Sequence, residues 1–412
     1  MADRTFVIVG GALAGAKAAE TLRGEGFDGR LVLVGEEAEL PYERPPLSKD
    51  YLRGEADAEA ARVHPAEFYE ENDVELRTGA YAESIDVRAG AVVLAGGERL
   101  EYDRLLLATG AQPRRLTVDG ADLEGVLYLR TLADSAAIRE RLKPGAHVAI
   151  VGAGWIGSEV AASARQMGAD VTLIEMTEVP LERVLGQRVG RFYRDVHEAH
   201  GVNFVGGAGV ERVEGRGHVE RVLLTGGATV EADTVVVGVG VAPRTELAEA
   251  AGLEIENGVR VSAALETSAP NVYAAGDVAN AWHPLLGRHV RVEHWANALN
   301  QAPAAARSML GSDVSYDRVP YFFSDQYDVG MEYSGHADAS DDVVIRGDVD
   351  AGEFIAFWMR DDVVRAGMNV NVWDVTDPIQ SLVRSGARVD KGRLASTDES
   401  LEELAAEVGA RA

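Results

Sequence analysis

Residues 148–157 read Val-Ala-Ile-Val-Gly-Ala-Gly-Trp-Ile-Gly, and this stretch decides the fold of the chain. The apolar run predicts a buried strand, and Gly152, Gly154 and Gly157 predict a tight turn into a helix. Such a turn presents backbone N–H groups to the pyrophosphate of a dinucleotide, with no side chain in the way. Glu175 follows the next strand pattern, where a carboxylate binds a ribose 2′-hydroxyl and repels a 2′-phosphate. We therefore expect a dinucleotide-binding unit that prefers NADH to NADPH.

The same pattern occurs earlier, so the sequence contains an internal repeat. Residues 6–15 read Phe-Val-Ile-Val-Gly-Gly-Ala-Leu-Ala-Gly, and Glu36 follows the next strand pattern as a ribose acceptor should. Gly10 and Gly15 keep their places, but the middle position is Ala12, whose methyl group would hold a cofactor slightly farther from the turn. Two such units in one chain favour a second dinucleotide site over a turn that is only structural.

Two dinucleotides in one chain indicate electron transfer between a nicotinamide and a flavin. Further strand patterns that end in glycine, at 105–110, 235–240 and 272–277, indicate that one unit is inserted in the other. Residues 320–373 carry alternating aromatic runs typical of an antiparallel sheet. The predicted fold class is α/β, with two Rossmann-like dinucleotide-binding domains and a C-terminal α+β domain. The predicted domains are 1–112 and 242–317 for FAD, 113–241 for NADH, and 318–412 for the C-terminal domain.

Composition excludes several classes of function. The chain has 412 residues and no cysteine, which excludes disulfide frameworks, thiolate metal sites, iron–sulfur ligation and cysteine nucleophiles. A formal net charge of −27 disfavours nucleic acid and anionic membranes as partners. The sequence has no run of about 18 apolar residues, and its first residues lead into a strand pattern rather than a signal peptide. We expect a cytoplasmic protein that moves electrons through bound organic cofactors.

Several motifs point to one family. Residues 41–49 read Pro-Tyr-Glu-Arg-Pro-Pro-Leu-Ser-Lys. Further family motifs lie at 108–110, 129–131, 154–159, 275–278 and 324–326. On these motifs, over residues 5–390, the chain resembles the FAD-dependent, NADH-using ferredoxin reductases that serve cytochrome P450 and aromatic-ring dioxygenase systems. The resemblance implies a glutathione-reductase-like fold, FAD and NADH as cofactors, and a [2Fe-2S] ferredoxin that receives single electrons.

The resemblance also implies which residues hold the cofactors. Asp277 would bind the ribityl chain of the flavin, Glu36 the adenosine ribose, and the Trp295 backbone the pyrimidine edge of the ring. The other implied FAD-binding residues are Gly10, Ala12, Leu13, Ala14, Gly15, Arg44, Lys49, Ala82, Ala108, Thr109, Gly110, Arg130, Gly276, Glu293 and His294. The implied NADH-binding residues are Gly152, Gly154, Trp155, Ile156, Gly157, Glu159, Glu175, Arg183 and Gly240.

Three residues are assigned to the hydride-transfer site. By the resemblance, Lys49 lies near the flavin and pairs with Glu159, so that the cation stabilises the charge on the reduced ring and the carboxylate orients the cation. The alternative is an ordinary ion pair between domains. Phe323 is expected to pack on the nicotinamide, but the family pattern has tryptophan there and at Tyr321, so the stacking face is smaller.

The partner and the remaining alternatives follow from charge and family. Arg288, Arg291, Arg307 and Arg318 form a locally basic segment, which we predict to dock the acidic ferredoxin; the alternative is that they scatter over the surface. Two other functions stay open: an NADH-dependent rubredoxin or diaphorase-type reductase, and a redox-sensing flavoprotein resembling apoptosis-inducing factor. We expect a monomer or a weak dimer.

No metal site is predicted. His197 and His200 are spaced i, i+3 with no third ligand nearby, so we expect them to lie at the solvated end of a helix.

Overall fold

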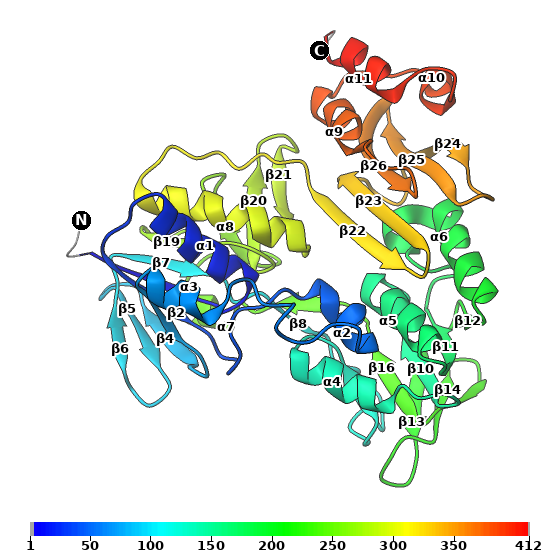
Figure 1. Cartoon of the computed structure of the whole chain (residues 1–412), viewed down its shortest axis with the longest axis horizontal. Coiled ribbons are helices and arrows are strands. Elements are labelled where there is room, and N and C mark those ends of the chain that lie inside the picture. Colours follow the sequence, from blue (N-terminus) through cyan, green and yellow to red (C-terminus); the bar gives the residue numbers. More distant parts are fainter. Residues whose placement is uncertain (1–3, 411–412) are drawn as a thin grey trace. The chain divides into compact units, whose positions relative to one another are not determined.

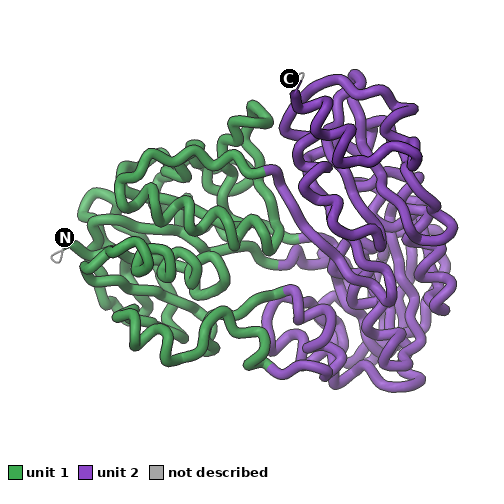
Figure 2. Tube along the Cα trace, turned by 45° about the horizontal axis from the view of Figure 1, so that its top comes forward, with its two compact units in different colours: residues 1–44, 58–112, 241–318 green, residues 45–57, 113–240, 319–412 purple. Residues whose placement is uncertain are grey.

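The computed structural model describes residues 4–410, which form two compact units (Figures 1 and 2). Unit 1 contains residues 4–44, 58–112 and 241–318, and unit 2 contains 45–57, 113–240 and 319–410. Residues 45–57, which the sequence analysis places in the first domain, therefore belong to unit 2. The chain passes between the units several times because each unit is assembled from separate segments.

Unit 1 is built on a parallel sheet of order β19-β7-β1-β2-β3. The strands are β1 (Thr5–Val9), β2 (Arg30–Val34), β3 (Val74–Arg77), β7 (Arg104–Leu107) and β19 (Val272–Ala274). Val9 pairs with Val34 on one side and with Leu107 on the other, so the carboxyl ends of three strands meet beside the turn that follows β1. This end of the sheet is where doubly wound folds bind ligands.

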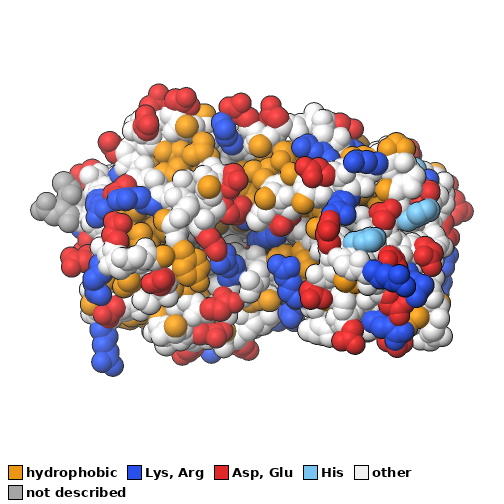
Figure 3. Space-filling view, turned by 90° about the horizontal axis from the view of Figure 1, so that it is seen from below, with side chains coloured by type: hydrophobic (Ala, Val, Ile, Leu, Met, Phe, Trp, Pro, Cys, Tyr) orange, Lys and Arg blue, Asp and Glu red, His pale blue; other side chains and the backbone are white. Residues whose placement is uncertain are grey.

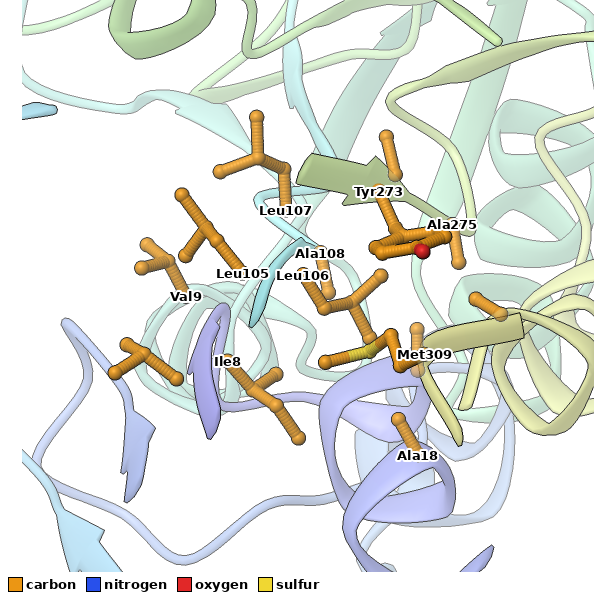
Figure 4. Packing of buried hydrophobic residues seen from close by; sticks show 14 of the residues in the cluster. Ile8, Val9, Ala18, Leu105, Leu106, Leu107, Ala108, Tyr273, Ala275 and Met309 are labelled. Atoms are coloured by element: carbon orange, nitrogen blue, oxygen red, sulfur yellow. The ribbon is translucent and has the colours of Figure 1, made fainter. Parts of the chain in front are cut away.

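Two long helices of unit 1 pack on each other, α1 (Leu13–Gly24) and α8 (Trp295–Leu310). Residues 6–8 of β1 are fully buried, as expected for a parallel strand covered on both faces. Figure 4 shows how Leu106, Met309 and Ala18 gather in the same core cluster. The core thus fixes the start of α1 against the sheet.

Smaller elements complete unit 1. An antiparallel sheet contains β4 (Ala82–Asp86), β5 (Ala91–Leu94) and β6 (Arg99–Glu101). A second small sheet contains β18 (Val259–Val261), β20 (Ala279–His283) and β21 (Arg288–Arg291). The short helices are α3 (Ala66–Glu71) and α7 (Glu246–Ala250), and the chain crosses between units near β8 (Ala111–Pro113) and β17 (Val241–Pro243).

Unit 2 repeats the parallel arrangement in a sheet of order β12-β11-β10-β16-β9. The strands are β9 (Val126–Tyr128), β10 (His147–Val151), β11 (Asp170–Ile174), β12 (Asn203–Val205) and β16 (Thr234–Val237). Its helices are α4 (Leu132–Arg141), α5 (Trp155–Gln166) and α6 (Glu182–Ala199). An antiparallel sheet contains β13 (Val210–Glu214), β14 (Arg221–Leu224) and β15 (Thr229–Glu231). The internal repeat in the sequence therefore corresponds to two similar sheets.

The C-terminal part of unit 2 is an antiparallel sheet of order β22-β23-β26-β25-β24 with three helices. The strands are β22 (Tyr321–Gln326), β23 (Val329–Gly335), β24 (Asp342–Asp348), β25 (Glu353–Arg360) and β26 (Val363–Val370). The helices are α9 (Thr376–Ser385), α10 (Lys391–Ala395) and α11 (Leu401–Gly409). Leu185, Val189 and Tyr193 of α6 join Phe354 and Trp358 in one buried core, so this sheet packs on α6. The predicted α/β class with a C-terminal α+β part is confirmed.

Candidate functional site

The first glycine turn links β1 to α1 in unit 1. Gly10 has φ +131°, and a Cβ there would lie 2.0 Å from the carbonyl oxygen of Ala108. A Cβ on Gly15 would lie 2.0 Å from the carbonyl oxygen of Gly10. Ala12 precedes the helix in an extended conformation that any residue adopts, and its side chain makes no capping bond. The two retained glycines are thus required by packing, whereas alanine at the middle position costs no backbone strain and leaves the first-turn N–H groups to a ligand.

A cavity of about 720 Å³, part of it open to solvent, lies at this turn. Seven of the residues predicted for FAD line it: Gly10, Ala12, Glu36, Arg44, Ala82, Ala108 and Thr109. The cradle of glycines, the uncapped helix start and the acid after β2 fit the adenosine diphosphate part of a dinucleotide. The other lining residues include Glu37, Tyr81 and Arg244, which the sequence analysis did not assign.

Two ion pairs border this cavity. Arg244 Nη1 lies 2.5 Å from Glu36 Oε2, so the predicted ribose acceptor has a cationic neighbour. Arg44 donates to Glu37 Oε1 at 2.9 Å and to the Tyr42 hydroxyl at 3.1 Å. Burial alone would lower the pKa of the Arg44 guanidinium, but Tyr42 and Glu37 together hold that pKa above its ordinary value. Arg244 directly follows Ala242 and Pro243, where the chain leaves the second dinucleotide-binding unit and returns to unit 1. This position in the sequence could have identified Arg244 as a residue of the first site.

The other predicted FAD residues of unit 1 gather near the start of α1. Gly276 has φ +79°, and a Cβ on it would lie 3.3 Å from Ala14 Cβ, which follows Leu13 in the first turn of α1. The Gly276 N–H donates to Gln301 Oε1 at 2.8 Å, which ties this strand end to α8. Asp277 follows directly. Glu293, His294 and Trp295 lie where α8 begins, and Gly110 follows β7. Their contacts with the flavin stay a prediction.

The second glycine turn, in unit 2, links β10 to α5. A Cβ on Gly157 would lie 1.9 Å from the Gly152 carbonyl oxygen, whereas a Cβ on Gly154 would meet no atom within 4 Å. Gly154 begins α5 without a capping side chain, so the space in front of the helix is open. Glu175 Oε2 accepts from the Ala153 N–H at 2.7 Å and Oε1 from the Met176 N–H at 2.8 Å. The carboxylate is therefore pinned beside the turn, as a ribose acceptor requires.

The remaining NADH candidates surround this turn. Trp155 is partly buried, and Ile156 is 37% exposed on the first turn of α5. Arg183 lies exposed on the first turn of α6, and Gly240 lies exposed after β16. Met176, directly after Glu175, is 67% exposed.

The predicted ion pair between Lys49 and Glu159 is present, and both residues belong to unit 2. Lys49 lies between η1 (Pro45–Ser48) and α2 (Asp50–Arg53), and its Nζ is 2.8 Å from Glu159 Oε2. The side chains are only 13% and 8% exposed. Ser48 donates to Glu159 Oε2 at 2.5 Å, and Ser324 donates to Glu159 Oε1 at 2.7 Å. The carboxylate thus has a partner for both oxygens, which offsets the cost of burying its charge.

Phe323 and Asp325 lie on the outer face of β22, near Lys49. The Lys49 ammonium is 5.8 Å from the centre of the Phe323 ring, within the range of a cation–π contact. Burial raises the pKa of Asp325, an effect that Lys49 opposes and Glu159 reinforces. Arg130 lies between β9 and α4 in the same unit, and its backbone N–H donates to Asp134 Oδ2 at 3.0 Å. The roles of Lys49, Phe323 and Arg130 toward the flavin stay predictions.

The four arginines of the predicted docking patch differ in their surroundings. Arg291 is 9% exposed and paired with Glu293, and Arg307 is paired with Glu25 at 2.6 Å. Arg288 and Arg318 are exposed. On the face drawn in Figure 3, basic side chains are interspersed with acidic ones, and no broad region of a single charge is visible there.

One expectation about histidine is wrong. His200 is exposed, but His197 is fully buried, so it does not lie at a solvated helix end. Its partners come from β22, far along the chain, which the local sequence could not reveal. Within residues 4–410, no group of three acidic or histidine side chains is arranged to hold a metal ion. None of the helices in the same range is both long and apolar enough to cross a bilayer.

Comparison with known proteins gives two family matches. Residues 4–302 match the family described as pyridine nucleotide-disulphide oxidoreductase. Residues 321–405 match the family described as reductase C-terminal. Together they span both parallel sheets and the C-terminal antiparallel sheet.

Individual relatives are similar over most of their length. The anthranilate 1,2-dioxygenase system ferredoxin–NAD(+) reductase component of Burkholderia cepacia is 39% identical, covering 98% of this chain and 99% of that protein. Putidaredoxin reductase of Pseudomonas putida is 37% identical, covering 90% and 89%. A chain in the crystal structure of the covalent putidaredoxin reductase–putidaredoxin complex superposes with a TM-score of 0.96 at 35% identity, covering 100% of both chains.

Proposed function

The chain belongs to the pyridine nucleotide-disulphide oxidoreductase family and uses FAD and NADH, and from this premise we propose that it reduces a [2Fe-2S] ferredoxin serving a P450 or a ring-hydroxylating oxygenase. The observation that carries the proposal is the pair of glycine turns, each opening a helix after a buried parallel strand. Gly10 and Gly15 would hold FAD, and Gly152, Gly154 and Gly157 would hold NADH.

The chain's own residues supply binding, alignment and electrostatics. When bound, FAD accepts a hydride from NADH and releases electrons one at a time. Glu175, pinned by two backbone N–H groups, would hold the nicotinamide dinucleotide by its ribose. Lys49 would place a cation where negative charge develops, and Glu159 would keep that cation oriented. No side chain is required as a general acid or base, so we expect no sharp bell-shaped pH profile.

The choice of acceptor rests on two facts. The chain has no cysteine, so it lacks the redox dithiol that disulfide reductases need. Two similar proteins are named as a ferredoxin–NAD(+) reductase component and as putidaredoxin reductase. Electrons that do not leave through a dithiol would pass from the flavin directly to the redox centre of the acceptor.

Anaerobic stopped-flow measurements test the proposed function. NADH should bleach the flavin band, and a [2Fe-2S] ferredoxin should then reoxidise the enzyme many times faster than rubredoxin does. Faster reoxidation by rubredoxin would favour the rubredoxin or diaphorase alternative. Reoxidation that is slow with every acceptor, together with an NADH-dependent dimer in sedimentation, would favour the redox-sensing alternative. A folded protein that binds no flavin would refute all three.

We infer further that the docking charge for the ferredoxin is carried mainly by the exposed arginines of this segment, Arg288, Arg307 and Arg318. Arg291 contributes less because its side chain is only 9% exposed. Docking charge acts mainly on the association rate and is screened by salt.

Charge reversal tests this patch. Arg288→Glu with Arg318→Glu should lower kcat/KM for ferredoxin about tenfold at low salt and leave ferricyanide reduction unchanged. Arg99→Glu is the matched control. Arg99 is exposed on β6, and its replacement by glutamate changes the net charge of the protein by the same amount as each of the two patch substitutions. Equal loss with ferredoxin and ferricyanide, or a comparable effect of Arg99→Glu, would contradict the patch.

A further inference from the structure

The inner face of β22 carries two buried polar side chains, Ser324 and Gln326, although the core beneath this sheet is apolar. Phe322, Ser324 and Gln326 alternate along the strand and point to the same side, and the latter two are each 1% exposed. Burying a hydroxyl and an amide is costly unless they are hydrogen-bonded. Their partners therefore explain why the strand carries them.

Those partners form one continuous chain of hydrogen bonds through unit 2. Ser324 Oγ lies 2.7 Å from Glu159 Oε1, and Gln326 Nε2 lies 3.3 Å from Ser324 Oγ. Gln326 Oε1 lies 3.0 Å from His197 Nε2, and His197 Nδ1 lies 3.3 Å from the Tyr327 hydroxyl. The chain runs from the end of the β22 strand to the carboxylate that holds Lys49.

Chemistry fixes the direction of every donor in this chain. The carboxylate of Glu159 only accepts, so the Ser324 hydroxyl gives it its single proton. Ser324 must then accept from the Gln326 amide, whose oxygen consequently faces His197. His197 therefore carries its proton on Nε2.

The other nitrogen of His197 completes the direction. Burial lowers the pKa of His197 to about 4, an effect that Gln326 opposes and His200 reinforces, so the ring is neutral near pH 7. A neutral ring with its proton on Nε2 accepts at Nδ1, which receives the hydroxyl proton of Tyr327. Burial also raises the pKa of Tyr327, so that hydroxyl stays protonated. All four donors thus point toward Glu159.

The outer end of the chain is held in a strained turn. Tyr327 is the first residue of the two-residue turn between β22 and β23, and its φ is +58°. A positive φ at this turn position favours glycine or asparagine, so a tyrosine in this conformation strains the backbone. Its ring stacks on His200 at 3.7 Å between centres, with 7° between the planes. The aromatic ring and hydroxyl are thus fixed at the strained turn by two contacts.

We propose that His197 is a positioning residue of the hydride-transfer site, which acts through Gln326 and Ser324 to fix the Glu159 carboxylate and, with it, the Lys49 ammonium. The inference rests on the proposed function, because only a flavin beside Lys49 makes the orientation of that cation matter. Because His197 donates from Nε2 to Gln326, its Nδ1 accepts from the Tyr327 hydroxyl, which is the first donor of the ordered chain. The His197 spacing that resembled a metal motif is explained by this role.

Two substitutions of His197 test whether it orients the Lys49–Glu159 pair or only stabilises the fold. In flavin-loaded protein, His197→Leu should slow hydride transfer from NADH about tenfold, with the NADH Kd and the flavin content unchanged. His197→Gln keeps a donor near the Nε2 position, so it should recover the rate to within about threefold of the parent. A His197→Leu protein that transfers hydride at the parent rate would overturn the proposal.

A double-mutant cycle shows whether His197 acts through Glu159. In a Glu159→Gln background, His197→Leu should change the rate less than about twofold, because the group it positions is already altered. An equal effect in both backgrounds would mean that His197 acts by another route, and would overturn the proposal. If Lys49→Ala also leaves the rate unchanged, the placement of the ion pair beside the flavin is at fault. If Lys49→Ala slows transfer and His197→Leu does not, only the present inference fails.

Two further measurements keep the proposal testable if His197→Leu does not fold. Tyr327→Phe removes the first hydroxyl of the chain and should slow transfer, whereas Tyr333→Phe, a buried tyrosine of β23 outside the chain, should not. Nitrogen-15 NMR of the parent protein should show His197 protonated at Nε2, identified by the signal lost in His197→Gln. Protonation at Nδ1, or equal rates for the two tyrosine variants, would contradict the proposed direction.

Discussion

Replacing Glu175 with glutamine should narrow the preference for NADH over NADPH by roughly 100-fold. The side chain keeps its length and an oxygen that can accept from the Ala153 N–H, but it loses its charge, and its NH2 group cannot accept from the Met176 N–H. In the parent protein, bonds from Ala153 and Met176 at 2.7 and 2.8 Å prevent the carboxylate from swinging away when a 2′-phosphate approaches. The substitution therefore removes the repulsion of a 2′-phosphate and keeps one of these two hydrogen bonds.

The magnitude follows from two contributions. A carboxylate that accepts from a ribose hydroxyl would lie about 4–5 Å from a phosphate at that position, which carries about −1.5 to −2 charges. At an effective dielectric constant of about 60, close to that of water, relief of this repulsion is worth about 2 kcal/mol for NADPH. Weakening a charged hydrogen bond to the ribose costs NADH about 1 kcal/mol. The sum of about 3 kcal/mol corresponds to roughly 100-fold in the ratio of kcat/KM values.

The assay is kcat/KM with each dinucleotide, with ferricyanide as acceptor so that partner docking plays no part. Glu178→Gln is the matched control, because it removes the same charge from an exposed position on the same loop. An unchanged ratio in Glu175→Gln would refute the ribose role of Glu175. An equal shift in Glu178→Gln would show that the general field of the loop, rather than a direct contact, sets the preference.

Two other predictions address the flavin site and the buried histidine. Gly15→Ala should yield protein with much less bound FAD, since its Cβ would lie 2.0 Å from a carbonyl oxygen, whereas Gly24→Ala, at the end of the same helix with open space around it, should stay yellow. Absorbance per polypeptide measures this, and full occupancy in Gly15→Ala would contradict the packing argument. His197 faces His200, Tyr327 and Gln326, and burial lowers its pKa to about 4 in the folded protein. In the unfolded chain the pKa of this histidine is about 6.5. Between these two pH values the unfolded chain therefore binds a proton at His197 that the folded chain does not. The free energy of unfolding should therefore fall as the pH drops through this window, by about 2–3 kcal/mol at pH 4.5 relative to pH 7.5. The His197→Gln variant should lose less of its free energy of unfolding over the same range. Denaturant unfolding at pH 7.5 and 4.5 measures both values.

Local sequence was sufficient to locate both dinucleotide turns. At Gly10, Gly15, Gly152 and Gly157 the structure leaves no room for a Cβ, so a short motif between a strand and a helix already encodes the packing. The same holds for Glu175, because a residue directly after a parallel strand lies at the sheet edge where the ligand binds. Gly15 and Gly157 pack on the carbonyl groups of Gly10 and Gly152, so these contacts lie within one βαβ unit. Gly10 and Gly152 pack instead on the carbonyl groups of Ala108 and Gly238, which a later strand of the same sheet brings to the turn.

Other parts of the site could not be predicted because their partners are distant in sequence. His197 looked like part of a solvated helix end, but Gln326 buries it from 129 residues away. The basic segment looked like a uniform patch, but Arg307 is paired with Glu25, 282 residues away. Charge counted along a segment does not show which charges folding neutralises.

The sequence by itself determined two glycine turns of the dinucleotide-binding type, the position of the acid Glu175 after the strand that follows the second turn, and the absence of a cysteine to carry electrons. These properties depend on residue types at short spacing, which the chain's local geometry preserves. Only the tertiary structure decided how Lys49 is held, since Glu159, Ser324 and His197 come from α5, β22 and α6 and meet through packing. A buried carboxylate needs a partner at each oxygen, and folding alone brings those partners together.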